Sequence, residues 1–389
     1  MIIDQAFKPM AKKASWVGSL YYLILFIGAG SYMPFLFVYF TELGLNGKQV
    51  GWLATLSPLM MLLLAMPVAS LADRFRVRVR VAQLATAGIC MIIFLLQFPR
   101  SFPGIALLMF GMAIFNSSNA SIAESLIARS AQRYRLNFGS IRLWGSFGFA
   151  ASALAFGVIW QRLGFGSMFL VSSFLVLPLI WISGNLEESL SLQQPKQASV
   201  MVLLRDRGLL ILVLATFLAA ISNSVSMTFS GIYARSLGGG NFVIGLMIAV
   251  GAFSELPAMF YSERLARLLT TPYTIILSYI LLALGFLGYI YSPSANLIPL
   301  FSILKGLGYG LWIPLTIRMI THRTPEHWAA TAQSLISMSI FGLAPLIASP
   351  LGGWINDAFS ARAVFWLGIG TLGLAVLVLA AAVHQKIIE

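Results

Sequence analysis

The sequence predicts an all-α membrane protein with twelve transmembrane helices in two pseudo-symmetric six-helix bundles. Of its 389 residues, 59% are apolar and only 10% are charged, whereas an ordinary soluble domain carries about 25% charged residues. Apolar runs of membrane-spanning length recur along the whole chain, and one polar stretch divides them into six and six. These observations exclude a soluble enzyme and leave no room for a large water-soluble domain.

Each spanning helix needs about 20 apolar residues. Runs of this kind lie near residues 16–40, 49–70, 81–98, 104–127, 138–160, 166–184, 208–234, 242–261, 273–291, 297–320, 328–355 and 363–383. The long polar stretch after the sixth run contains Glu187, Glu188 and Pro195. We therefore expect an N-terminal bundle at residues 1–184, a cytoplasmic linker at 185–207 and a C-terminal bundle at 208–389.

The net charge of +13 comes from short basic blocks between the apolar runs, so it predicts membrane anchors rather than a nucleic-acid surface. With both termini and the linker inside, seventeen Lys and Arg residues are cytoplasmic and five are external. The external five are Lys48, Arg100, Arg162, Arg235 and Arg362. Because cytoplasmic loops retain positive charge, we expect a protein of the plasma (inner) membrane with both termini in the cytoplasm.

The basic first fourteen residues carry no cleavage site, so we expect an uncleaved terminus. The single cysteine, Cys90, excludes a disulfide within the chain.

The two halves share a repeat. Shifting the sequence by 194 residues aligns residues 39–44 with 233–238, and residues 50–51 with 244–245. Parallel repeats of six helices are a transporter architecture that places the solute site at mid-membrane between the halves.

Four charged residues fall inside predicted spans: Glu124 in the fourth, Arg142 in the fifth, Glu255 in the eighth and Lys305 in the tenth. A charge at bilayer depth costs several kcal/mol, so such residues mark a functional path by default. Glu124 and Arg142 lie at similar depth on antiparallel neighbouring spans and are expected to pair. The pair either bridges the two helices structurally or binds a hydroxyl-rich or anionic solute.

Glu255 has no cation within a turn of its own helix, which favours uptake and release of a proton. It is the first candidate for proton coupling, with Glu124 as the second; a protonated Glu255 that only joins two helices is the alternative. Lys305 is the candidate that would favour an anionic solute. Whether it pairs with Glu255 stays open at this point.

Uncharged polar and aromatic side chains complete the candidate binding set. Asn119 and Asn223 lie at mid-depth in their spans, where they bind solute or join helices by hydrogen bonds. Aromatic residues that could stack on a solute, or alternatively pack against other helices, are Tyr32, Trp144, Phe149 and Trp312.

Residues 69–80, at the end of the second span, contain Leu71-Ala72-Asp73-Arg74, followed by arginines at 76, 78 and 80. This stretch resembles the loop signature Gly-x-Leu-Ala-Asp-Arg-x-Gly-Arg-Arg of the major facilitator superfamily, with Ala69 and Arg76 at the glycine positions. The resemblance implies that Asp73 and Arg74 belong to a cytoplasmic gating network.

A second resemblance rests on Glu124, Arg142 and residues 138–149. This part of the sequence resembles the corresponding stretch in one branch of the superfamily, which contains the lactose permease, the phenylpropionate permease and the nucleoside–proton symporters. The resemblance implies that Glu124 and Arg142 bind the solute while Phe149 stacks on it. Ser254-Glu255-Leu256-Pro257 resembles the eighth-span glutamate motif of this branch. In the tenth span, Lys305-Gly306 stands where some relatives have His-Gly.

Together these features predict a proton-coupled secondary transporter, a symporter by our interpretation, for a sugar, a nucleoside or an aromatic carboxylate. A proton-driven drug exporter is the alternative, although the fifth span lacks a Gly-Pro motif. An intramembrane enzyme or metal site is disfavoured because the histidines, His322, His327 and His384, lie at cytoplasmic helix ends; a channel is disfavoured by the duplicated halves. We expect a monomer in the lipid bilayer whose partners are the solute and protons, with no cofactor, metal or nucleic acid.

Overall fold

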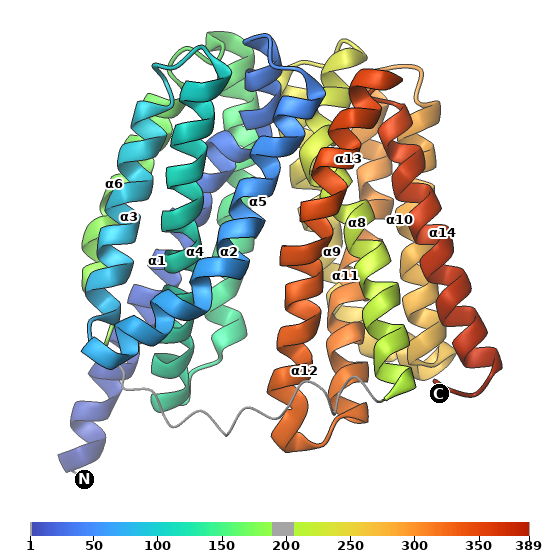
Figure 1. Cartoon of the computed structure of the whole chain (residues 1–389). Coiled ribbons are helices and arrows are strands. Elements are labelled where there is room, and N and C mark those ends of the chain that lie inside the picture. The colour runs from blue at the N-terminus through green and yellow to red at the C-terminus, as the bar shows by residue number, and fades with distance from the viewer. Residues whose placement is uncertain (1, 189–205, 389) are drawn as a thin grey trace. The chain divides into compact units, whose positions relative to one another are not determined.

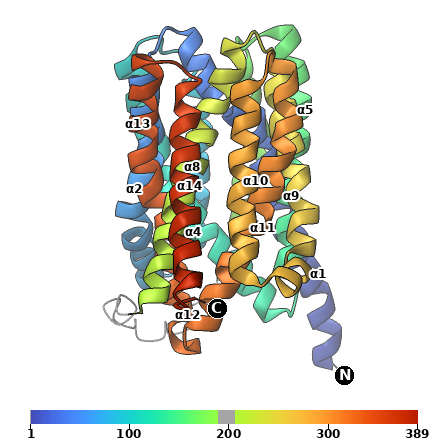
Figure 2. The same ribbon diagram turned by 90° about the vertical axis from the view of Figure 1, so that its right-hand side faces the viewer.

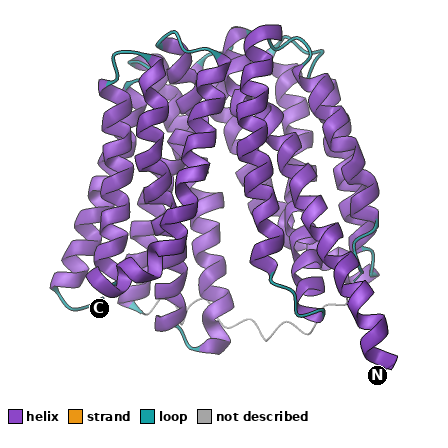
Figure 3. Cartoon of the chain, turned by 180° about the vertical axis from the view of Figure 1, so that it is seen from behind, coloured by secondary structure: helices purple, strands orange, loops and turns teal. Residues whose placement is uncertain are grey.

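The computed structural model describes residues 2–188 and 206–388, and Figure 1 shows the helices that these residues form. Helices joined by short loops make up these two stretches, and neither contains a strand (Figure 3). The first half contains α1 (Ile2–Glu42), α2 (Gly47–Phe75), α3 (Arg78–Leu95), α4 (Phe102–Arg133), α5 (Phe138–Leu163) and α6 (Met168–Gly184). Most of the predicted linker, residues 189–205, lies outside the described residues.

The second half contains α8 (Arg207–Ser236), α9 (Asn241–Leu269), α10 (Thr271–Tyr291), a 3₁₀ turn (Ala295–Leu297), α11 (Ile298–Arg323), α12 (Glu326–Met338), a π-helical turn (Ser339–Leu343), α13 (Ala344–Ala358) and α14 (Ala363–His384). Figure 2 shows α9, α10 and α11 side by side, and α8 beside α14.

Eleven helical segments of the described chain are long and apolar enough to cross a membrane. The continuous segment Thr331–Ala358, which includes α12, the π turn and α13, counts as one of them. The twelfth apolar helix, α6, has 17 residues, which is the lower limit for a membrane span. Each predicted run thus corresponds to a helix, and the predicted all-helical membrane architecture is confirmed.

The repeat at 194 residues is visible in the backbone at two pairs of helix ends. After α1, the amide of Gly44 donates to the Thr41 carbonyl; after α8, the amide of Gly238 donates in the same way to the Arg235 carbonyl. Both glycines have positive φ, 91° and 79°, as expected where a helix ends in a left-handed residue.

The second pair follows α2 and α9, where Arg76 and Thr270 have φ of 55° and 64°. They are also 194 residues apart, and neither is a glycine. The equivalent chain reversals support a true duplication.

The chain forms two compact units. One contains Met1–Tyr39 with Leu56–Gln193, and the other contains Phe40–Thr55 with Gln194–Glu389. A short early segment therefore belongs to the second unit.

Within the second unit, the Asp357 carboxylate accepts hydrogen bonds from the amides of Gly47 at 2.6 Å and Lys48 at 2.8 Å. A carboxylate at a helix N-terminus satisfies free amides and the helix dipole. Gly353 allows the close approach, since a Cβ there would collide with the Gly47 carbonyl. Asp357 therefore caps α2.

Candidate functional site

Asp73 organises a cluster of polar side chains at the end of α2. Its carboxylate accepts hydrogen bonds from Nε and Nη2 of Arg78, the first residue of α3. Arg78 is buried and also donates to Ser125 Oγ at 2.7 Å. Arg74, the predicted gating partner, is exposed and lies 5.9 Å from the ring of Phe75. Arg78, which was not among the residues predicted from the sequence, is thus the arginine that pairs with Asp73.

Two acidic residues after α6 accept hydrogen bonds at the same end of the first unit. The Glu188 carboxylate accepts from the amides of Arg78 and Val79, both at 3.0 Å, and so caps α3. Glu187 accepts from the Tyr134 hydroxyl at 2.9 Å. Burial, with a further contribution from Glu187, raises the pKa of the Tyr134 phenol.

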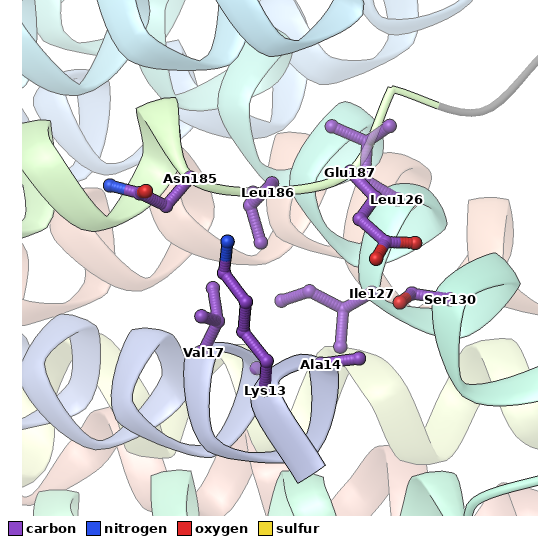
Figure 4. A pocket seen from close by; sticks show the side chains of 10 residues that line it. Lys13, Ala14, Val17, Leu126, Ile127, Ser130, Asn185, Leu186 and Glu187 are labelled. Atoms are coloured by element: carbon purple, nitrogen blue, oxygen red, sulfur yellow. The ribbon is translucent and has the colours of Figure 1, made fainter. Parts of the chain in front are cut away.

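A small recess lies beside these residues (Figure 4), and Glu187 forms part of its wall. Lys13 extends from α1 toward Asn185 and Leu186, while much of the remaining wall is aliphatic. The recess contains none of the predicted solute-binding residues.

Glu124 on α4 and Arg142 on α5 form the predicted pair. Arg142 Nη1 donates to Glu124 Oε1 at 2.7 Å, and the two side chains are 58% and 47% exposed, in that order. The short loop between α4 and α5 makes the two helices antiparallel. Residues 124 and 142, which are 18 apart in the sequence and lie on either side of this loop, are therefore at the same depth in the membrane. The exposed pair retains unused donors and acceptors for a ligand.

A row of aromatic rings runs from Tyr22 through Phe26 to Phe149. The ring of Phe149 on α5 meets that of Phe26 on α1 edge-on, with centroids 6.2 Å apart. Phe26 stacks at 6.3 Å on Tyr22, one helical turn earlier. Gly145 makes room, because a Cβ there would lie 2.8 Å from the Phe26 ring.

Tyr22 interacts electrostatically with both Glu124 and Arg142, and its buried hydroxyl has no hydrogen-bond partner among the described residues. Neither Tyr22 nor Phe26 was among the residues predicted from the sequence. Their spacing of four residues on one helix face was the available signal.

The other predicted residues of the first unit lie differently. Asn119 is buried, and its Oδ1 accepts from the hydroxyls of Tyr21 at 3.1 Å and Thr86 at 3.4 Å, so it joins three helices. Tyr32 is buried. Trp144 is half-exposed and contacts Phe147 rather than the ion pair. Phe149 is thus connected to the charged pair only through the rings of Phe26 and Tyr22.

Lys305 on α11 occupies a cage within the second unit. Its ammonium donates to Ser226 Oγ on α8 and, at 3.4 Å, to the Tyr289 hydroxyl on α10. It lies 4.9 Å from the Tyr289 ring centroid and 5.4 Å from that of Phe286, distances typical of cation–π contacts. The aliphatic stem passes over Gly285, where a Cβ would lie 2.6 Å from Lys305 Cγ.

Glu255 on α9 interacts electrostatically with Lys305, but these two described residues do not form an ion pair within 4.0 Å. The backbone of Glu255 packs against Gly310 of α11, where a Cβ would lie 2.5 Å from the Glu255 carbonyl. Asn223 is half-buried, one turn before Ser226 on α8, whereas Trp312 is fully buried. The Lys305 ammonium is therefore held by uncharged groups, and the carboxyl group of Glu255 is a separate group nearby.

No group of three or more His, Cys, Asp or Glu residues in the described parts of the chain could hold a metal ion.

The chain has charged side chains on membrane-crossing helices and a repeated six-helix arrangement. These two features are typical of one class of protein, the multi-pass membrane transporters. Residues 15–367 match the MFS_1 like family, and the chain therefore belongs to it. The protein is accordingly a transporter of the major facilitator type and not an enzyme.

Similar proteins support the same assignment. The maltose permease of Geobacillus stearothermophilus is 28% identical over 97% of each chain. The putative nucleoside transporter YegT of Escherichia coli is 23% identical over 92% of this chain and 90% of its own. Among solved structures, a mutant of the nucleoside transporter NupG superposes with a TM-score of 0.83, at 14% identity over 95% of this chain and 99% of NupG.

A bacterial homologue of the human lysosomal transporter Spinster superposes with a TM-score of 0.70, at 15% identity over 96% of this chain and 95% of its own. These structural likenesses show the major facilitator fold.

Proposed function

We propose that the protein is a proton-coupled symporter for a small hydroxyl-bearing solute, a sugar or a nucleoside. The observation that carries the proposal is the half-exposed Glu124–Arg142 pair, which interacts with Tyr22 at one end of the row of rings that leads to Phe149. A carboxylate accepts hydrogen bonds from hydroxyl groups, a guanidinium donates to ring or carbonyl oxygens, and an aromatic wall suits the apolar face of a sugar or base. The names of the maltose permease and the putative nucleoside transporter point to the same two solute classes.

Proton coupling is assigned to the second unit, where Glu255 and Lys305 interact without pairing directly. Coupling requires that proton occupancy and solute occupancy bias the same conformational equilibrium. A carboxyl group without a fixed cationic partner can gain or lose a proton without breaking an ion pair. We therefore assign the transported proton to Glu255, and we place the protein in the plasma (inner) membrane with cytoplasmic termini.

The test uses the purified full chain in proteoliposomes that contain a pH-sensitive dye. A disaccharide, a nucleoside and an aromatic carboxylate are added separately without an imposed proton gradient. We expect the sugar or the nucleoside to drive protons inward in the wild type, and Glu255→Gln to abolish that signal while solute still binds.

Glu124→Gln should weaken binding of the same solute. The matched control is Glu263→Gln, which changes an exposed carboxyl on the same helix as Glu255. Solute uptake without proton movement would overturn the coupling, and unchanged binding by Glu124→Gln would overturn the site.

A further inference from the structure

The helix α2 is shared between the two compact units. Residues 40–55 belong to the second unit, whereas the rest of the helix, from Leu56 to Phe75, belongs to the first. The helix is continuous through this boundary. The start of α2 is therefore tied to one unit and its end to the other.

Two polar contacts hold residues 40–55 within the second unit. The Asp357 carboxylate at the end of α13 accepts hydrogen bonds from the first two amides of α2. Arg235 of α8 pairs at 2.9 Å with Glu42, the last residue of α1. Asp357 and Glu42 are exposed, so water can take over as their partner when either contact breaks.

The backbones of α2 and α13 meet through small residues. A Cβ on Gly353 of α13 would collide with the Gly47 carbonyl, and a Cβ on Gly51 would collide with the Ser349 carbonyl. Small residues allow two helices to approach closely, but they carry no long side chains that interlock. The start of α2 can therefore separate from α13 without repacking of either helix at these positions.

The other end of α2 is held differently. Asp73 pairs there with Arg78, which is buried and also donates to Ser125 of α4. Breaking this contact would leave charged groups buried without a partner, which is costly. Of the two ends of α2, the start is the one whose contacts can open and close.

The two halves of a transporter with repeated six-helix bundles move against each other during alternating access. A helix that is tied to both halves must then bend or release one of its ends. We infer that Asp357 is a releasable latch, which holds residues 40–55 on α13 in the conformation described here and releases them in the opposite conformation of the transport cycle. This device goes beyond the symporter proposal, because it does not depend on which solute or ion is carried.

A reversible tether distinguishes a latch from a permanent cap. The full chain with Cys90→Ser has no other cysteine. Lys48→Cys and Asn356→Cys are added and joined by a short bifunctional methanethiosulfonate reagent. The two positions are within reach, since Asn356 Nδ2 would lie 2.5 Å from a Cβ on the adjacent Gly47. Uptake of radiolabelled sucrose and uridine, as a disaccharide and a nucleoside, is measured in proteoliposomes.

We expect the tether to reduce uptake of the transported probe at least tenfold, and dithiothreitol to restore it. The control tether joins Tyr291→Cys to Arg362→Cys, because the Arg362 guanidinium lies 6.0 Å from the Tyr291 ring and both residues belong to the second unit. It should leave uptake unchanged. Full uptake by the protein tethered at positions 48 and 356 would overturn the inference. If neither probe enters the wild type, the proposed solute class fails, and the next measurement decides the latch.

That measurement needs no solute. Ser349 is 1% exposed, so N-ethylmaleimide should modify Ser349→Cys only when α2 separates from α13. We expect Asp357→Ala to increase the rate of modification several-fold, with Asp357→Asn intermediate because its amide oxygen still accepts a hydrogen bond. The control is Asp206→Ala, which removes a cap made to the amide of Leu209, three residues away on the same helix. Equal rates with and without Asp357→Ala would overturn the inference, as would equal acceleration by Asp206→Ala.

Discussion

Arg142 donates to Glu124 at 2.7 Å, yet both side chains stay about half exposed. A pair that only held α4 to α5 would gain from being enclosed, because water weakens exposed ion pairs. An exposed pair with spare hydrogen-bonding atoms is better suited to exchanging partners with a solute. Binding and stability should therefore respond differently when the pair is changed.

Arg142→Lys should separate these two effects. Lysine keeps the charge but loses the planar fork that makes several hydrogen bonds. Because a hydrogen bond to a charged group contributes about 1.5–3 kcal/mol, solute affinity should fall about tenfold or more. The free energy of unfolding should change by about 0–1 kcal/mol. Calorimetric titration measures the solute affinity, and thermal unfolding in detergent measures the stability. A large loss of stability with unchanged affinity would show that the pair is a structural bridge instead.

Tyr22→Phe and Tyr21→Phe form a matched pair on α1. The Tyr22 hydroxyl is buried without a hydrogen-bond partner among the described residues, so its removal should leave the protein as stable or more stable. The Tyr21 hydroxyl donates to Asn119 at 3.1 Å, and its removal should cost about 1 kcal/mol. Thermal unfolding of both variants gives the comparison. If Tyr22→Phe were the more destabilising change, Tyr22 would have a structural partner that the geometry does not show.

Arg78→Ala should destabilise the first unit far more than Arg74→Ala. Removal of Arg78 leaves the Asp73 carboxylate without its buried partner, which costs about 3 kcal/mol. Arg74 is exposed beside Phe75, so its removal should cost under about 1 kcal/mol. Chemical or thermal unfolding distinguishes the two variants, and equal losses would contradict the assignment of Arg78 as the partner of Asp73.

Gly285→Ala should disturb the Lys305 cage without removing any of its members. The added methyl group would lie 2.6 Å from Lys305 Cγ, so the stem must move away from Phe286 and Tyr289. We expect solute-driven proton uptake in proteoliposomes to fall several-fold. Gly370→Ala is the control, since nothing lies within 4 Å of a Cβ at that position. Normal uptake by Gly285→Ala would show that the position of the ammonium does not matter for coupling.

The sequence could predict the twelve spans because hydropathy and length are local properties of the chain. It could also predict the pairing of Glu124 with Arg142, since a short connection between antiparallel helices leaves few depths for either residue. It could not choose between Arg74 and Arg78 as the partner of Asp73, because that depends on how α3 begins. Nor could it find Tyr22, whose place in the site depends on the face that α1 turns toward its neighbours.

The attachment of residues 40–55 to the second unit, through Asp357 and the amide of Gly47, has a practical consequence. A gene divided at the linker would give two polypeptides whose ends do not coincide with the compact units. The first product would carry the start of α2, whose capping carboxylate is encoded on the second. The second product would lack residues 40–55 of its unit, so the two products would have to be made together to regain the cap.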